Sequence, residues 1–147
     1  MTFAYSLSIG LITFVKVEAM TGDVLHAQSS DHPGLVIVLK NGIKYEAELP
    51  NYKARDRTYE IELSAQNDFQ PSLVCSKQYI KEVYLEARGT DGWYIVSIET
   101  YAWENERYTR LTADPDFNKW LDGDHEDPYP YDAEKYLLTK TKNGKKK

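Results

Sequence analysis

The sequence predicts an all-β fold, an antiparallel β-sandwich of two roughly four-stranded sheets. Two observations predict it. Hydrophobic and polar residues alternate with a period of two in several short segments, as in strands that have one dry and one wet face. Turn-forming Gly, Asn, Asp and Pro residues separate these segments at intervals typical of a sandwich. No segment of ten or more residues has a helical period, and residues 116–121 are the one candidate for a helical turn.

Six segments carry the strand pattern. In chain order they span residues 14–24, 35–39, 44–49, 59–63, 78–87 and 93–99. The hairpin signal Asn41-Gly42 closes the second segment, and Pro50-Asn51 ends the third. In the fifth segment Val83 and Leu85 share one face, while Tyr and Glu residues occupy the other. Residues 88–92, which contain two glycines and an aspartate, form the predicted turn before the last segment.

Length and charge predict one domain with a basic tail. A chain of 147 residues lies near the commonest domain size. We predict a single sandwich over residues 1–139, in which residues 1–11 are an extension or the start of the first strand, and a disordered lysine-rich tail over residues 140–147. The tail carries five lysines, so the remaining chain has 13 basic and 23 acidic residues and a net charge of −10. A body this acidic repels phosphate groups, which argues against a nucleic-acid partner.

The first nineteen residues allow two interpretations. Residues 3–15 are apolar enough for the core of a signal peptide with a cleavage site at residues 17–19, and the protein would then be secreted. If these residues instead lead into the first strand, we expect a cytoplasmic protein. The uncleaved strand is favoured, because no Lys or Arg precedes the apolar run and cleavage would remove the strand that leads into Thr21. The run is too short for a transmembrane helix.

The opening segment and the region around Trp93 resemble the PLAT family, the β-sandwich domain of polycystins, lipoxygenases and clostridial alpha-toxin. In that family an opening strand ends in Thr-Gly-Asp, a Trp begins a later strand, and an Asn-Arg-Trp-Leu element closes the domain. This sequence has residues 21–23 (Thr-Gly-Asp), Trp93 and residues 118–121 (Asn-Lys-Trp-Leu) in the same order. It departs from the family at residues 30–34, which replace a Gly-Thr-Asp-Ala motif, and at Phe117, where a cysteine is common.

The resemblance implies a calcium site. Family members that bind calcium use carboxylates and carbonyls from the loop after the first strand and from the loop before the Trp strand, and calcium prefers six to eight oxygen ligands. The matching loops contain Ser30 and four candidate calcium ligands: Asp23, Asp31, Thr90 and Asp91. The alternative is that the aspartates are ordinary turn residues. The departure from the family motif in the first loop favours this alternative.

The sequence contains no motif for catalysis. His26 and His32 share a loop with Ser29 and Ser30, but the chain lacks the G-x-S-x-G elbow that holds a hydrolase serine. The single cysteine, Cys75, has no base beside it in sequence and is predicted to be a buried, inert thiol. We therefore predict a protein that is not an enzyme.

The predicted function is that of a non-catalytic binding module. The resemblance implies docking to a protein partner or to a lipid surface, and the acidic body with many Tyr and Glu residues favours a protein. Lipid contact would use Trp103, at a predicted turn, and the tail lysines Lys145, Lys146 and Lys147. The alternative from a different class is a carbohydrate-binding sandwich that stacks sugars on exposed Tyr and Trp rings.

Overall fold

The structure is a computed structural model that describes residues 10–89, 91–123 and 132–141. Within these ranges the chain forms strands and one short 3₁₀ helix. In order they are β1 (Phe14–Thr21), β2 (Gly34–Leu39), β3 (Lys44–Glu48), β4 (Thr58–Ser64), β5 (Phe69–Gln70), the 3₁₀ helix η2 (Lys77–Tyr79), β6 (Ile80–Glu86), β7 (Trp93–Glu104), β8 (Arg107–Asp114), β9 (Lys119–Leu121), β10 (Asp132–Ala133) and β11 (Lys135–Leu137). None of the described helices has the length and apolar character needed to cross a membrane.

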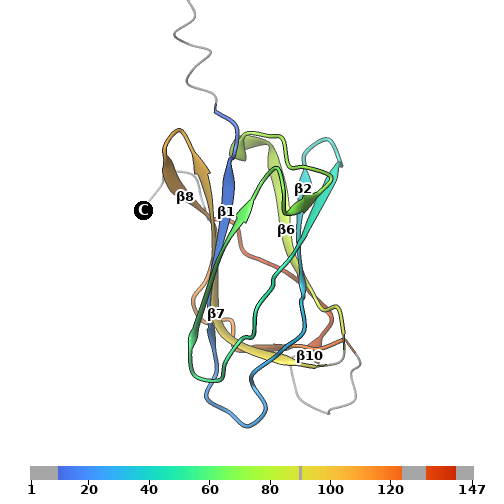
Figure 1. Ribbon diagram of the computed structural model, residues 1–147, viewed down its shortest axis with the longest axis vertical. Helices are drawn as coiled ribbons and strands as arrows, with labels where there is room; N and C mark the ends of the chain where they lie inside the picture. Colours follow the sequence, from blue (N-terminus) through green and yellow to red (C-terminus); the bar gives the residue numbers. More distant parts are fainter. Residues whose placement is uncertain (1–9, 90, 124–131, 142–147) are drawn as a thin grey trace, which may run out of the picture.

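The strands form two sheets that face each other as a sandwich (Figure 1). The six-stranded sheet has the order β10-β9-β7-β1-β4, with β8 also paired to β7, and the five-stranded sheet has the order β11-β6-β2-β3-β5. Neighbouring strands are antiparallel except β9 and β10, which are parallel. The predicted sandwich is confirmed. Each sheet is wider than predicted. Strands such as β5, β10 and β11 are too short to show a period in the sequence, and the eight-residue β8 was not predicted because its residues do not alternate between buried and exposed.

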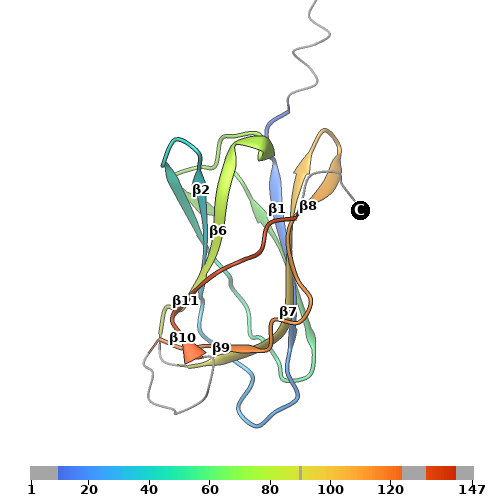
Figure 2. The same ribbon diagram turned by 180° about the vertical axis from the view of Figure 1, so that it is seen from behind.

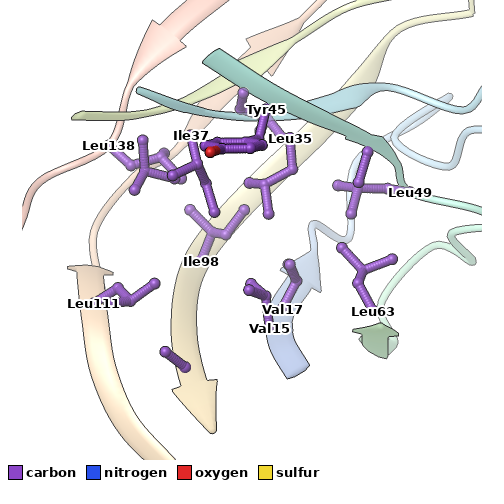
Figure 3. Close-up of a cluster of buried hydrophobic side chains, with 14 of the residues drawn as sticks. Val15, Val17, Leu35, Ile37, Tyr45, Leu49, Leu63, Ile98, Leu111 and Leu138 are labelled. Atoms are coloured by element: carbon purple, nitrogen blue, oxygen red, sulfur yellow. The ribbon is translucent and has the colours of Figure 1, made fainter. Parts of the chain in front are cut away.

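The hydrophobic core lies between the two sheets, where the apolar faces of the strands meet. Val15 and Val17 of β1 are fully buried, while Lys16 between them lies on the outer face. From the other sheet, Leu35 and Ile37 of β2 are equally buried. Figure 3 shows these side chains pointing toward one another across the interior. The period-two alternation of the sequence therefore marks the inner face of the strands correctly.

The turn between β7 and β8 lies later than the sequence suggested. We expected strand to end at residue 99 and Trp103 to lie at a turn, but β7 continues to Glu104. Asn105 and Glu106 form the turn, with φ of 55° and 63°, as in a tight two-residue hairpin. Residues 116–121 form a turn followed by β9, so the expected helical turn is absent there.

The first strand and the end of the described chain both belong to the sandwich. β1 pairs with β4 on one side and with β7 on the other, so a cut after Ala19 would remove most of a central strand. After β11 the chain crosses between the sheets (Figure 2): the Leu138 amide donates to the Val83 carbonyl, and the Thr141 amide donates to the Leu111 carbonyl. Residues 140 and 141, which the sequence assigned to the tail, thus lie against β8; residues 142–147 lie outside the described residues.

The connections gather at two ends of the sandwich. The end at the bottom of Figure 1, called the loop end below, is built from residues 22–33, 49–57, 87–89, 91–92 and 122–123. The other end, called the opposite end below, is built from residues 10–13, 39–43, 65–79 and 105–106.

Candidate functional site at the loop end

Two aspartates join the loops that precede β2 and β7. The Asp91 amide donates a hydrogen bond of 2.7 Å to Oδ2 of Asp31, and the Ser30 amide donates one of 2.8 Å to Oδ2 of Asp91. The Ser30 hydroxyl donates to the same Asp91 oxygen at 3.2 Å. Each carboxylate therefore accepts a hydrogen bond from a backbone amide of the other loop. We call this reciprocal arrangement the aspartate clasp.

Ser29 and Gly89 complete the clasp. The buried Ser29 hydroxyl donates to the Asp91 carbonyl at 2.9 Å and accepts from the Asp31 amide at 3.1 Å. Gly89 has a φ of +143°, and a Cβ at this position would lie 2.3 Å from Oδ2 of Asp31. Only glycine allows both this backbone conformation and the close approach of the Asp31 carboxylate.

The other calcium candidates have different surroundings. Asp23 forms an ion pair in which its Oδ1 accepts from Nε of Arg55 at 3.1 Å. Thr90 lies outside the described residues. Over residues 10–89, 91–123 and 132–141, no group of three or more His, Cys, Asp or Glu side chains is arranged to hold a metal ion. The structure thus brings together Asp31 and Asp91, while Asp23 is engaged with Arg55.

A buried lysine lies beneath the clasp. Lys53 is 0% exposed, although lysine is almost never fully buried in globular proteins. Its Nζ donates to the carbonyl oxygens of Asn51 at 2.7 Å, Leu49 at 2.9 Å and Asp31 at 3.0 Å, and the Pro50 carbonyl lies 3.5 Å away. Burial lowers the pKa of Lys53 to about 8, although the Asp31 carboxylate favours the charged form. The side chain is therefore mostly an ammonium at neutral pH.

Two aromatic rings line the Lys53 ammonium. Nζ lies 4.8 Å from the ring centre of Tyr59 and 5.6 Å from that of Trp93, distances at which a cation is attracted to a ring face. The rings meet edge to face, 5.7 Å apart. The Tyr59 hydroxyl donates to the Pro50 carbonyl at 2.5 Å, and Nε1 of Trp93 donates to the Thr21 hydroxyl at 2.8 Å. Burial raises the pKa of the Tyr59 hydroxyl well above its usual value. Sequence reasoning missed Lys53, because a lysine within a polar loop carries no signal of burial.

Apolar side chains project from the surface of the loop end. Val24 is 42% exposed, Leu25 is 68% exposed, and Tyr52 is 59% exposed. The two loops that carry them are joined by a pair of backbone hydrogen bonds between Ser29 and Lys53, of 3.1 and 2.8 Å. We call Val24, Leu25 and Tyr52 the apolar tip. Nothing in the sequence marks these three residues, because exposure of a short apolar pair depends on how the loop folds.

The serine and histidine residues of the same loop do not form a catalytic arrangement. Ser29 bonds within the clasp, as described above, and His26 is exposed, with a left-handed φ of 66°. Nδ1 of His32 lies 3.8 Å from Oε1 of Glu48 on the surface. Among the described residues no serine donates to a histidine, so the loop offers no activated nucleophile there.

The opposite end contains a buried carboxylate and an open apolar groove. Glu104, 8% exposed, accepts from the Ser76 hydroxyl at 3.0 Å and from the Lys77 amide at 2.9 Å. The groove, about 380 Å³ in volume, is lined mainly by Leu11, Leu39, Val74, Cys75 and Tyr79. Cys75 is 6% exposed, and burial, together with the Glu104 charge, raises its pKa to about 11. The predicted buried thiol is confirmed.

Trp103, the predicted lipid contact, lies on β7 near the opposite end rather than at a loop tip. It is half-buried, and its ring packs edge to face against Tyr108 with centres 4.9 Å apart. On the same outer face, Nζ of Lys16 lies 4.9 Å from the ring centre of Tyr101 and 4.5 Å from that of Tyr108. The ring pairs recorded among the described residues meet at 52° to 78°. No coplanar pair among them forms the stacking platform that a carbohydrate-binding surface was expected to have.

Comparison with known proteins relates the fold to two groups of larger proteins. No family model matches the chain, and no curated protein matches it in sequence. Among solved structures, alpha-toxin from Clostridium absonum matches 88% of this chain with 21% identity and a TM-score of 0.62. Alpha-toxin from an avian strain of Clostridium perfringens matches 77% with 17% identity and a TM-score of 0.57. A calcium-dependent 11R-lipoxygenase matches 87% with 14% identity and a TM-score of 0.54.

These matches show a shared fold. The chain spans 32% and 30% of the two toxin chains and 17% of the lipoxygenase chain. The resemblance to the PLAT sandwich that the sequence suggested is thereby confirmed at the level of the fold.

Proposed function

We propose that the chain is a non-catalytic docking module that binds a lipid surface through the apolar tip of the loop end. The observation that carries this proposal is the exposure of Val24, Leu25 and Tyr52 on loops fixed by backbone hydrogen bonds. An exposed apolar side chain gains about 1.5–3 kcal/mol when it leaves water completely. Tyrosine suits the membrane interface because its ring is apolar and its hydroxyl remains in contact with water.

The charges around the tip favour a surface with little net charge. Asp23 and Arg55 form an ion pair beside the tip, and the exposed Asp56 and Arg57 of the neighbouring loop are again one acid and one base. Insertion of Val24 and Leu25 would therefore depend on apolar burial more than on attraction to anionic headgroups. Lys145, Lys146 and Lys147, which lie outside the described residues, would add roughly 1 kcal/mol per lysine near an anionic membrane.

Trp103 is not part of this docking surface. β7 begins at the loop end with Trp93 and carries Trp103 toward the opposite end. The ten residue steps between the two tryptophans correspond to about 33 Å of strand. A flat membrane that meets Leu25 would therefore leave Trp103 in water, so we assign Trp103 to packing on the sheet surface.

Sedimentation with lipid vesicles tests the proposal. The full chain should co-sediment with phosphatidylcholine vesicles, and Leu25→Ser combined with Val24→Ser should reduce the bound fraction severalfold, because two of the three side chains of the apolar tip become polar while neither contributes to the buried core. Leu137→Ser is the matched control, since Leu137 is 56% exposed on β11, and its binding should equal that of the unaltered chain. Equal binding by the tip variant, or equal loss in the control, would contradict the proposal.

A protein partner on the outer face of the six-stranded sheet is the second candidate. Glu60, Glu18 and Glu99 lie directly opposite one another on β4, β1 and β7, an arrangement that places three like charges in one row. Glu18 and Glu99 are each paired within the sheet, to Lys16 at 3.1 Å and to Arg110 at 3.3 Å, so the row is partly neutralised, and the exposed Glu60 adds the charge that a basic partner would meet. Binding of a lysine-rich peptide, measured by titration calorimetry, should weaken in a variant with Glu18→Gln and Glu60→Gln. Glu82→Gln, on the other sheet, is the control and should bind as the unaltered chain does.

A further inference from the structure

Lys53 stands out because all of its hydrogen-bond partners are backbone carbonyls. The ammonium has three N–H donors, and the carbonyls of Leu49, Asn51 and Asp31 accept at 2.9, 2.7 and 3.0 Å. Two of these carbonyls come from the loop between β3 and β4, and the third comes from the loop before β2. A single positive charge thus joins irregular backbone from two separate loops, where no strand ladder is present to do so.

Two buried aromatic rings lie beside the ammonium. Tyr59 and Trp93 are 6% and 1% exposed, and each has its polar atom engaged in a hydrogen bond. Ring faces at these distances attract a cation. The Tyr59 hydroxyl and the Trp93 indole N–H are hydrogen-bonded elsewhere, so the two residues contact the ammonium through their ring faces. Three carbonyls therefore match the three N–H donors of the ammonium, and two ring faces lie beside it.

The same donor set does not fit calcium. Calcium takes six to eight oxygens at about 2.3–2.6 Å and prefers carboxylates among them. The carbonyls of Leu49, Asn51 and Asp31 accept from an ammonium, and among the described residues the clasp brings together two carboxylates, Asp31 and Asp91, fewer than the three or more His, Cys, Asp or Glu side chains of a metal cluster. A divalent ion bound at the clasp would also lie close to the Lys53 charge and be repelled by it. The calcium dependence stated for the 11R-lipoxygenase therefore does not carry over to these residues.

We propose that the Lys53 ammonium is the resident cation of the loop end, which it holds in its docking conformation without calcium. Tyr52 precedes Lys53 directly, and Asn51 adopts a left-handed φ of 72°, so the bend that exposes Tyr52 is formed by the residues whose carbonyls the ammonium binds. Lys53 is also the residue whose backbone pairs with Ser29, at the base of the loop that carries Leu25. This inference rests on the proposed lipid docking for its consequence, although the cation site itself does not.

The first part of the test needs no substitution. Adding millimolar calcium, or removing it with a chelator, should leave the melting temperature of the full chain and its binding to phosphatidylcholine vesicles unchanged, because no vacant divalent site is involved. A rise in melting temperature with calcium that is lost in Asp91→Asn would overturn the proposal.

The second part removes the ammonium and restores it from solution. Lys53→Ala should lower the melting temperature, and exchange of the Ser29 and Lys53-position amides should accelerate about tenfold or more, as expected for local opening of the two loops. Propylammonium chloride, which matches the atoms removed, should reverse both changes, whereas propanol at the same concentration should not. Equal rescue by propanol, or no effect of either compound, would overturn the proposal.

One further variant keeps the outcomes distinct. Lys53→Met preserves the side-chain volume without the charge, so it should bind vesicles severalfold more weakly than the unaltered chain at a temperature at which circular dichroism shows it folded. Binding equal to that of the unaltered chain would overturn the proposal. If the unaltered chain does not bind vesicles, the proposed docking function fails, while amide exchange and amine rescue still decide whether Lys53 is the cation of the loop end.

Discussion

Each end of the sandwich buries a charged side chain that contacts irregular backbone, Lys53 at the loop end, where Asp122 is buried as well, and Glu104 at the opposite end, and the two are used differently. At the loop end the Lys53 ammonium donates to carbonyls from two loops and lies against aromatic rings. At the opposite end the Glu104 carboxylate accepts from the Ser76 hydroxyl and the Lys77 amide, which belong to a single segment. The cation therefore joins separate parts of the chain, whereas the anion positions the start of η2.

This difference shows where irregular backbone depends on a charged side chain for its hydrogen-bond partners. Strands satisfy their own polar groups through ladders, but loops at a sandwich end leave carbonyls and amides that must find partners when buried. Lys53 supplies donors to orphan carbonyls, and Glu104 supplies acceptors to an orphan amide and a hydroxyl. We therefore expect substitutions at the ends to act locally, and substitutions in the apolar middle to act on the whole domain.

The middle of the sandwich should give the largest effect on stability. Leu85 is 0% exposed on β6, and Leu85→Ala should lower the free energy of unfolding by about 2–5 kcal/mol through lost burial and the cavity left behind. Urea unfolding followed by circular dichroism measures this. Leu137→Ala on the neighbouring strand β11 is the control and should change the midpoint little, because Leu137 is 56% exposed.

The opposite end should give an intermediate effect. Glu104→Ala leaves the Ser76 hydroxyl and the Lys77 amide without their acceptor, which should cost about 1–3 kcal/mol of the free energy of unfolding. Glu104→Gln keeps an acceptor oxygen and should cost less in the same urea titration. Identical midpoints for the two variants would show that the carboxylate positions nothing at this end.

The aspartate clasp should respond weakly to loss of charge. In Asp91→Asn the amide oxygen can still accept from the Ser30 amide, so the free energy of unfolding should change by less than about 1 kcal/mol. Asp91→Ala removes the acceptor and should cost more. A calorimetric melting curve that shows a large loss in Asp91→Asn would indicate that the negative charge itself, and not its hydrogen bonds, joins the loops.

The smallest effect concerns the reactivity of Cys75 at the opposite end. Its pKa is raised to about 11 by burial and by the Glu104 charge. At about pH 8 the reactive thiolate should therefore be roughly a hundredfold scarcer than for an unperturbed cysteine. Alkylation by iodoacetamide should be slow and should accelerate up to about pH 11, and Glu104→Gln should shift this profile to lower pH.

The raised pKa of Cys75 also predicts how the stability of the fold changes with pH. Because the pKa of the thiol is higher in the folded state than in the unfolded state, its contribution to stability is fully present below about pH 9 and is lost as the pH rises toward 11. An alkylation rate at about pH 8 equal to that of the unfolded chain would contradict both the raised pKa and the burial of Cys75.

The sequence by itself determined the sandwich and much of its core. Val83, Leu85 and Trp93 are buried as their alternation predicted, because the two faces of a strand are set by a period of two that is local in the chain. The order of the motifs around Trp93 also led to the fold that the toxin and lipoxygenase structures share. The loops of Asp31 and Asp91 meet at one end, as that fold implies.

The tertiary structure alone decided how those loops are held together and which side chains they expose. The sequence neighbours of Lys53 are typical of an exposed loop. Lys53 is buried because Asp31, Tyr59 and Trp93, from three other segments of the chain, pack around it. Lys140, which the sequence placed in the tail, contacts the sandwich for the same reason. It pairs with Thr112 of β8, and its Nζ donates to the Ile80 carbonyl of the other sheet at 2.7 Å. Local periodicity reports which way a side chain points, whereas the partners of a buried charge come from distant parts of the chain and leave no local pattern.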